Sequence, residues 1–352
     1  MWLLHPGRRR GTTLVFLLSL AGGNGLAIGA GAAQPPTETA AWSSPPYAEI
    51  ERIRTVALKL GPDEASLNAV LTLPAAGDRP PVVILVHGSG PGDMDETLGP
   101  NKPFRDLAEG LATRGIAVLR YDKRTRIYPQ SFLNIAKPTV KDEVIDDVDR
   151  AVALMKSRSD IDPRRIIVLG HSLGGTLAPR IAAANKDVAG LVILAGATRS
   201  LPDIMLEQIT YLAAVKHASG PEVDRQTAAI RAAVDQARAA KPGDSGPMIL
   251  GAPPSYWGDL NHYDPAAVAA NLSIPMLILQ GERDYQVRIA DVERFRQALA
   301  GHANAEIHVL AGLNHLFMPS PGTGLGTPAD YEKAGHIDPE VIDRIAGFVG
   351  KL

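Results

Sequence analysis

The segment VLGHSLGGTLAPRIAAA, residues 168–184, joins two different sequence patterns without an intervening loop. The residues RRIIVLG that lead into it form a short β-branched apolar run, typical of a buried strand, and Leu and Ala recur at helical spacing after it. Ser172 stands at this junction between Gly170 and Gly174, where a Cβ would collide with neighbouring backbone. This G-x-S-x-G pattern predicts a tight strand-to-helix turn that exposes the Ser172 hydroxyl. The alternative is a glycine-rich helix start at which Ser172 is only the N-cap.

Apolar runs and helical patterns alternate along most of the chain. The predicted strands are PVVILVH (81–87), IAVLRYD (116–122), RRIIVLG (164–170), VAGLVILAG (188–196), IPMLILQG (274–281) and AEIHVLAG (305–312). The predicted helices include KPFRDLAEGLATRG (102–115), VKDEVIDDVDRAVALMKSR (140–158), IADVERFRQALAG (289–301) and PEVIDRIAGFVGK (339–351). Such alternation predicts an α/β fold, a mostly parallel sheet with helices on both faces.

Three further segments define the expected domain organisation. Residues 33–48 are rich in Pro and Ser and are typical of a linker, and a hairpin of two strands (52–60 and 67–74) then opens a single domain over 49–352. Residues 200–273 break the alternation, because they hold helical patterns and no clear strand. We interpret them as a helical cap inserted over the carboxyl edge of the sheet; ordinary crossover helices are the alternative.

The N-terminus has the three parts of a secretory signal peptide. Arg8–Arg10 precede the short apolar run TTLVFLLSL, and small residues continue to a cleavage pattern at Ala30-Gly31-Ala32. Residues 1–32 are therefore predicted to direct export to the periplasm or the medium, with no stable membrane anchor after cleavage. A buried N-terminal helix is the alternative.

Composition excludes several classes of function. The 352 residues carry a net charge of −2 with no long basic block beyond the N-terminus, which argues against nucleic-acid binding. Cysteine is absent, so disulfides and thiolate chemistry are ruled out. No H-E-x-x-H occurs and GSGPGD does not match G-x-G-x-x-G, so neither a metal nor a dinucleotide cofactor is expected.

A serine nucleophile needs a base and an acid to orient that base. Asp284 follows the predicted strand 274–281, and we prefer it to Glu282 because it lies further out in the loop. His315 follows the next predicted strand, so both side chains are expected at one edge of the sheet. His171 adjoins Ser172, but neighbours on so sharp a turn point apart, and we interpret it as a packing residue.

An oxyanion site should accompany the nucleophile. One donor is expected to be the N–H of Leu173, directly after Ser172. The second should come from the loop HGSGPGD (87–93), with the N–H of Ser89 as first choice and that of Gly90 as second. A simple glycine-rich turn is the alternative interpretation of this loop.

These residues resemble the α/β-hydrolase fold, and HGSGPGDMDETLGPNKPFRDLAEGLATRGIAVLRYDKRT (87–125) resembles the EstD-like group of bacterial esterases. The resemblance implies a carboxylesterase for short acyl esters, with Ser172, Asp284 and His315 at the triad positions. It also marks YDKRT (121–125) as a family landmark, in which Asp122, Lys123 and Arg124 are expected to form an ion-pair network that braces the loops.

The leading hypothesis is ester hydrolysis through an acyl-enzyme, with a small-molecule ester as the substrate; the sequence does not indicate an oligomeric state. A peptidase or amidase on the same triad is the runner-up, and Glu207 or Asp259 are its candidates for holding a free amine. A non-catalytic binding protein is the third hypothesis. Tyr256, Trp257 and Tyr263 could wall an acyl pocket or form the core of the cap.

Overall fold

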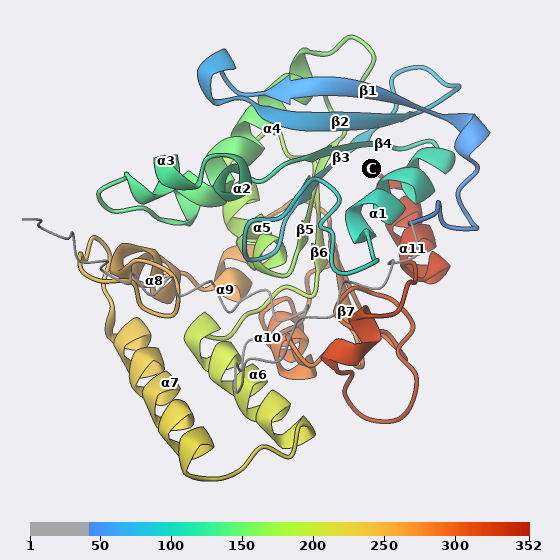
Figure 1. The fold of residues 1–352 in the computed structure, drawn as a ribbon. Helices are drawn as coiled ribbons and strands as arrows, with labels where there is room; N and C mark the ends of the chain where they lie inside the picture. The colour runs from blue at the N-terminus through green and yellow to red at the C-terminus, as the bar shows by residue number, and fades with distance from the viewer. Residues whose placement is uncertain (1–41) are drawn as a thin grey trace, which may run out of the picture.

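The computed structural model describes residues 42–352, which build one mixed sheet covered by helices (Figure 1). The strand order is β1-β2-β4-β3-β5-β6-β7-β8. The strands are β1 (Ile53–Leu60), β2 (Leu67–Pro74), β3 (Val82–Val86), β4 (Ala117–Tyr121), β5 (Ile166–His171), β6 (Gly190–Leu194), β7 (Met276–Gly281) and β8 (Ala305–Leu310). The predicted α/β class is confirmed.

The direction of the strands decides where a site can form. β1 and β2 make the predicted antiparallel hairpin, and β2 is also antiparallel to β4. From β4 through β3 and β5 to β8 every neighbouring pair is parallel. The carboxyl ends of these parallel strands therefore meet at one edge, which is where ligands bind in open α/β sheets.

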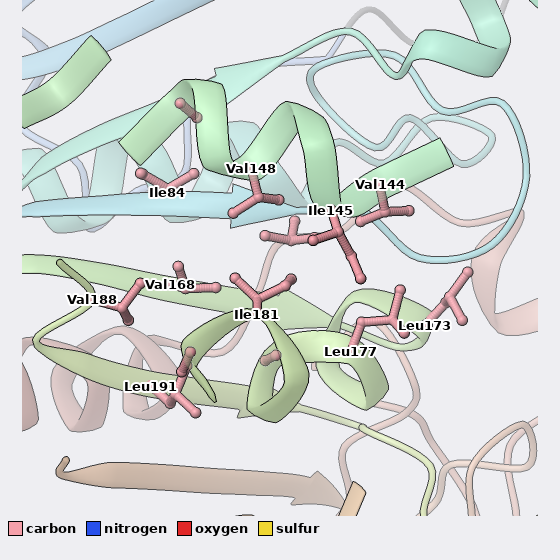
Figure 2. Packing of buried hydrophobic residues seen from close by; sticks show 14 of the residues in the cluster. Ile84, Val144, Ile145, Val148, Val168, Leu173, Leu177, Ile181, Val188 and Leu191 are labelled. Carbon is pink, nitrogen blue, oxygen red and sulfur yellow. The ribbon is translucent and has the colours of Figure 1, made fainter. Parts of the chain in front are cut away.

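The helices cover both faces of the sheet because the buried strands are apolar on both sides. In β3, Val82, Ile84 and Val86 belong to one core cluster, and Val83 and Leu85 belong to the other. α4 (Asp146–Ser157) and α5 (Leu173–Ala184) pack on the first face, as Figure 2 shows. α1 (Pro103–Thr113) and α11 (Pro339–Gly350) pack on the second.

Residues 195–275 lie between β6 and β7. They contain α6 (Leu201–Val215), α7 (Pro221–Ala239), α8 (Pro254–Asn261) and α9 (Pro265–Ala269), and no strand is present in this described stretch. α6 and α7 lie side by side beyond the sheet (Figure 1), whereas α9 packs against α5. Helix α10 (Ile289–Ala298) then follows β7, and the short helices α2 (Arg124–Ile127) and α3 (Pro129–Leu133) follow β4.

The chain ahead of β1 is attached to α1. The guanidinium of Arg105 lies 4.1 Å from the Trp42 ring centroid, and Tyr47 packs against Gly110. The end of the predicted linker, residues 42–48, is therefore packed against the domain. The predicted signal peptide and residues 33–41 lie outside the described part of the chain, and none of the helices within 42–352 has the length and apolarity needed to cross a membrane.

The junction of β5 and α5 is the tight turn that the sequence predicts. Ser172 adopts φ 53° and ψ −116°, a combination that a residue with a side chain rarely occupies. A Cβ on Gly170 would overlap the carbonyl of Gly174, and a Cβ on Gly174 would overlap the carbonyl of Val86 in β3. The two glycines thus let α5 begin in direct contact with β5 and β3.

Gly174→Ala should therefore destabilise the protein by about 3 kcal/mol, because backbone rather than a mobile side chain must give way. Gly347→Ala in α11 is the matched control. No atom lies within 4 Å of a Cβ at that position, so this change should stabilise the helix by about 0.5–1 kcal/mol. Urea unfolding of both variants measures the two effects, and equal stabilities would contradict the packing described for the turn.

Candidate active site

Asp284 and His315 meet at the carboxyl edge of the sheet, in the loops after β7 and β8. The Nδ1 of His315 donates to Oδ2 of Asp284 over 2.6 Å, and both side chains are buried. The alternative acid, Glu282, is exposed and accepts the N–H of Gly312 instead. Because Nδ1 carries the proton, Nε2 of His315 is left able to accept one.

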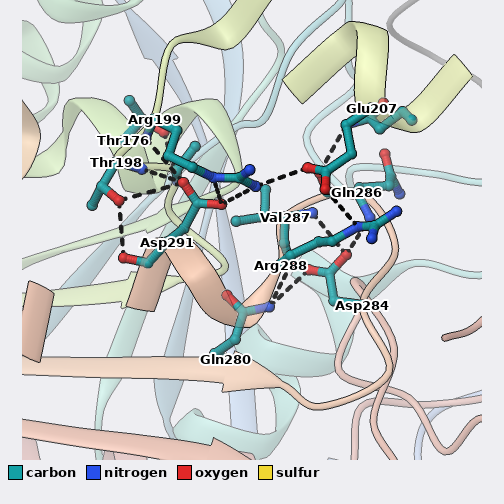
Figure 3. A network of polar contacts seen from close by, with 12 residues as sticks. Thr176, Thr198, Arg199, Glu207, Gln280, Asp284, Gln286, Val287, Arg288 and Asp291 are labelled. Carbon is teal, nitrogen blue, oxygen red and sulfur yellow. Dashed lines mark hydrogen bonds and ion pairs between the residues drawn. The ribbon is translucent and has the colours of Figure 1, made fainter. Parts of the chain in front are cut away.

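Three further donors fix the carboxylate of Asp284. The side-chain amide of Gln280 donates to Oδ2 over 3.0 Å, and the backbone N–H groups of Gln286 and Val287 donate to Oδ1 over 2.7 and 3.0 Å (Figure 3). Asp284 is 1% exposed, so these donors replace the water that a charged carboxylate would otherwise need. This carboxylate can therefore orient His315 without moving.

A single cavity of about 210 Å³ holds Ser172, His315, Ser89 and Leu173 in its wall. The structure thus brings the predicted nucleophile, base and oxyanion residues to one place. The remaining lining is largely apolar and comes from the loop after β3, from α5 and α6, and from the loops after β7 and β8; it includes Leu98, Leu201, Ile204, Val287 and Leu316.

The two predicted oxyanion donors are free of competing acceptors. Neither the N–H of Ser89 nor that of Leu173 donates a hydrogen bond to any residue of 42–352. Gly88 lies against the nucleophile, since a Cβ at that position would come within 3.2 Å of the Ser172 Cβ. Two backbone donors beside one hydroxyl can stabilise a negative oxygen that develops there.

His171 does more than pack, contrary to the sequence-based interpretation. Its Nδ1 bonds Oε2 of Glu96 and its Nε2 bonds the backbone carbonyl of His315, both over 2.9 Å. Because both partners are acceptors, both ring nitrogens must carry a proton. Burial opposes the charged ring, but the Glu96 carboxylate, the His315 carbonyl and the charge of Asp284 together outweigh burial and raise the pKa of His171.

Glu96 is the residue that the sequence analysis missed. Its burial disfavours the charge, but His171, with smaller contributions from His87 and the Gly88 N–H, keeps the pKa of Glu96 below its usual value. Oε1 of Glu96 accepts the N–H of Gly88 over 2.6 Å. One carboxylate therefore ties the loop after β3 to His171, and through His171 to the backbone of His315.

Of the three residues of YDKRT expected in an ion-pair network, Lys123 and Arg124 form ion pairs. Nζ of Lys123 lies 2.7 Å from Oε1 of Glu143, and Arg124 pairs with Asp147 in α4. Asp122 takes a different part, because its carboxylate accepts hydrogen bonds from Asn68 and from the N–H of Met94. Lys123 and Asp122 therefore contact the loop after β3, whereas Arg124 contacts α4.

The aromatic residues of the 200–273 segment serve the core and not the cavity. The hydroxyl of Tyr256 donates to Glu143 over 2.6 Å, and the indole of Trp257 donates to the carbonyl of Ile249 over 2.6 Å. Tyr263 donates to the carbonyl of Thr176 in α5. None of the three lines the cavity that holds Ser172.

The two carboxylates considered for binding an amine are paired elsewhere. Glu207 accepts from Arg199 over 2.9 Å and lies 3.3 Å from Arg288, and Arg199 also pairs with the buried Asp291 (Figure 3). Asp259 receives both arms of Arg180. Among the described residues, no group of three or more His, Asp or Glu side chains is arranged to hold a metal ion.

Comparison with known proteins identifies the fold. The family model described as "Alpha/beta hydrolase family" matches residues 83–325, which run from within β3 to beyond β8 and include all the predicted site residues. The chain belongs to this family. The match spans the elbow at Ser172 and the loops that carry Asp284 and His315, so the family resemblance predicted from the motifs is confirmed.

A curated relative in this family is Esterase EstD of Thermotoga maritima, which is 44% identical over 288 residues. These residues make up 81% of this chain and 66% of that protein, so the chain spans slightly less than two thirds of the relative. The identity confirms the predicted resemblance to EstD-like proteins.

Two solved structures show the same fold at low identity. The hyperthermophilic esterase from Pyrobaculum calidifontis has a TM-score of 0.53 and 16% identity, covering 85% of each chain. The puromycin-hydrolyzing peptidase of Mycobacterium tuberculosis has a TM-score of 0.52 and 19% identity, covering 85% of this chain and 39% of that one.

The Glu96–His171 pair should make stability depend on pH. The raised pKa of His171 stabilises the fold below its usual value of 6.5 and loses this effect as the pH rises through the folded-state value. The lowered pKa of Glu96 stabilises the fold above 4.5 and loses the effect in acid. The pair therefore contributes most to the free energy of unfolding between pH 4.5 and pH 6.5.

Glu96→Gln should accordingly reduce the free energy of unfolding more at about pH 6 than at about pH 9, by a difference on the order of 1 kcal/mol. Urea denaturation at both pH values measures it. Glu282→Gln, a change of an exposed carboxylate, is the control and should show no such difference. The same loss at both pH values would mean that His171 does not titrate between them and would contradict this prediction.

Proposed function

We propose that this protein is a carboxylesterase-type serine hydrolase that cleaves short-chain acyl esters through an acyl-enzyme. The observation that carries the proposal is the buried 2.6 Å hydrogen bond from His315 to Asp284 beside a cavity that also holds Ser172 on its strained turn. A nucleophile, an oriented base and backbone donors that have no partner within residues 42–352 are, at one cavity, the parts that acyl transfer requires.

In the first half of the reaction, Nε2 of His315 takes the proton from the Ser172 hydroxyl as its Oγ attacks the ester carbonyl. The resulting tetrahedral oxyanion accepts hydrogen bonds from the N–H groups of Ser89 and Leu173. Asp284 stabilises the imidazolium. The carbon–oxygen bond to the alcohol then breaks, His315 returns the proton to that oxygen, and the acyl group stays on Ser172.

In the second half, a water molecule attacks the acyl carbon while His315 takes one of its protons. A second oxyanion forms in the same place. The bond to Ser172 breaks, His315 returns the proton to Oγ, and the carboxylic acid leaves. The cavity of about 210 Å³ is in keeping with a small acyl group.

The residues that line the cavity favour an uncharged substrate. Glu96 is the only carboxylate among the described residues of the cavity wall, and it is already bonded to His171 and to the Gly88 N–H. Glu207 and Asp259 are paired with arginines, so neither is available for the free amine of an aminopeptidase substrate. The 44% identity to a protein named an esterase points the same way. Export of this hydrolase, directed by residues 1–32, is part of the proposal.

Asp284→Asn should lower kcat by about 10⁴-fold, because the amide cannot hold the reactive tautomer of His315. Glu282→Gln, two residues away and exposed, is the matched control and should retain activity. Ser172→Ala should abolish labelling by a fluorophosphonate probe. Hydrolysis of p-nitrophenyl butyrate measures the first two variants, and equal rates for them would reject Asp284 as the acid.

The choice between ester and amide is tested with the wild-type protein. We expect p-nitrophenyl butyrate to be hydrolysed with a kcat/KM at least about 10²-fold above that of aminoacyl-p-nitroanilides, because the cavity offers no unpaired carboxylate for an amine. A series from acetate to palmitate should show a cut-off at short chains. Anilide turnover equal to ester turnover would overturn the esterase proposal in favour of a peptidase.

A further inference from the structure

The two peptide groups that flank Gly88 are each held by a charged side chain, the His87–Gly88 group by Glu96 and the Gly88–Ser89 group by the buried Lys123. On one side, Oε1 of Glu96 accepts the Gly88 N–H over 2.6 Å. On the other, Nζ of Lys123 donates to the Gly88 carbonyl over 2.8 Å. Hydrogen bonds to charged groups are among the strongest in proteins, so the backbone at Gly88 has little freedom to rotate.

Lys123 is an unusual residue to find at this depth. It is 2% exposed, and its ammonium group has two acceptors, the carbonyl of Gly88 and the carboxylate of Glu143 at 2.7 Å. Glu143 is itself held by the hydroxyl of Tyr256 over 2.6 Å. The ammonium group therefore has a fixed position under the loop.

Because the peptide bond is trans, the contact between Lys123 and the Gly88 carbonyl also fixes the direction of the Ser89 N–H. The Gly88–Ser89 bond is trans, so the Gly88 carbonyl and the Ser89 N–H point in opposite directions. Since the carbonyl points at Lys123, the Ser89 N–H points away from Lys123. Ser89 lines the cavity that holds Ser172, and Lys123 does not.

Glu96 adds a link between this loop and the base. Its second oxygen bonds His171, whose Nε2 donates to the backbone carbonyl of His315. A chain of hydrogen bonds thus runs from the Gly88 N–H to the backbone of the base. These hydrogen bonds connect the loop that carries Ser89 to the loop that carries His315 and fix their relative positions.

We propose that Lys123 and Glu96 are positioning residues that fix the Gly88–Ser89 peptide so that the Ser89 N–H faces the oxyanion. The inference rests on the proposed function, because it concerns the transition state of the same site. Lys123 lies outside the cavity wall, and Glu96, which is part of that wall, has its two carboxylate oxygens bonded to the Gly88 N–H and to His171. Each acts through the backbone of Gly88, where the opposite rotation of one peptide plane would replace a donor by a carbonyl oxygen and repel the oxyanion.

The test compares two variants that both lack the Lys123–Glu143 ion pair. Glu143→Gln keeps Lys123 on the Gly88 carbonyl and keeps an acceptor for Tyr256. The double variant Lys123→Met with Glu143→Gln removes the contact to Gly88 and leaves no unpaired buried charge. The readouts are kcat and KM for p-nitrophenyl butyrate and the affinity for a short-chain alkyl trifluoromethyl ketone, which forms a tetrahedral adduct with the serine.

Relative to Glu143→Gln, we expect the double variant to lose about 10- to 100-fold in kcat, since deleting an oxyanion donor outright costs about 10²–10³-fold. KM should change little, and the affinity for the ketone should fall by the same factor as kcat. Glu96 is the other residue that holds this loop. Glu96→Ala should lower kcat more than Glu96→Gln does, because the amide oxygen of Gln can still accept the Gly88 N–H. Arg124→Met, which removes a neighbouring ion pair with Asp147 that does not touch the loop, should leave both readouts unchanged.

A lower melting temperature with kcat and ketone affinity equal to those of Glu143→Gln would overturn the inference and leave Lys123 a purely structural residue. That result differs from a failure of the proposed function. If the function is wrong, the wild-type protein itself neither hydrolyses the ester nor binds the ketone, and the inference falls with it.

Discussion

The contact between the start of α5 and the strands β3 and β5 is the constraint on which the site depends. Gly170 and Gly174 have no Cβ, so α5 can begin with its backbone against the carbonyls of β3 and β5. At this close approach Ser172 adopts φ 53° and ψ −116°. The cost of that conformation, of order 1–3 kcal/mol, is offset by the apolar packing of α5 on the sheet. The position of the hydroxyl is thus a consequence of core packing.

The free-energy balance of the buried ion pairs around the site differs from that of the turn at Ser172. An ion pair such as Lys123–Glu143 loses most of its hydration on folding, and apolar residues of similar volume are often as stable or more so. Its net contribution to stability is therefore a weak reason for its presence. What apolar residues could not do is hold a backbone carbonyl and a backbone N–H at fixed positions. Lys123 and Glu96 do so on either side of Gly88.

The sequence allowed the sheet, its helices and the edge of the site to be predicted because these follow from local patterns and from chain order. Asp284 and His315 were found because each follows a strand, and parallel strands end at the same edge. His171 was misjudged as packing, since its partners Glu96 and His315 lie 75 and 144 residues away in sequence. No local pattern reports a contact between two loops. The one signal was the presence of acidic residues in the segment HGSGPGDMDE, and which of Asp93, Asp95 and Glu96 reaches His171 depends on how that loop folds.

The contacts of the aromatic residues in the segment 200–273 likewise could not be predicted from local sequence patterns. Tyr256, Trp257 and Tyr263 were grouped by sequence, and their chemistry suited a pocket wall as well as a core. Tyr256 reaches Glu143 and Tyr263 reaches α5, so this group ties the segment to the helices below it and to the partner of Lys123. Packing of the helices between β6 and β7 thus bears on the support of Gly88. A segment that contributes Leu201 and Ile204 of α6 to the cavity also stabilises, through Glu143, the lysine under the oxyanion loop.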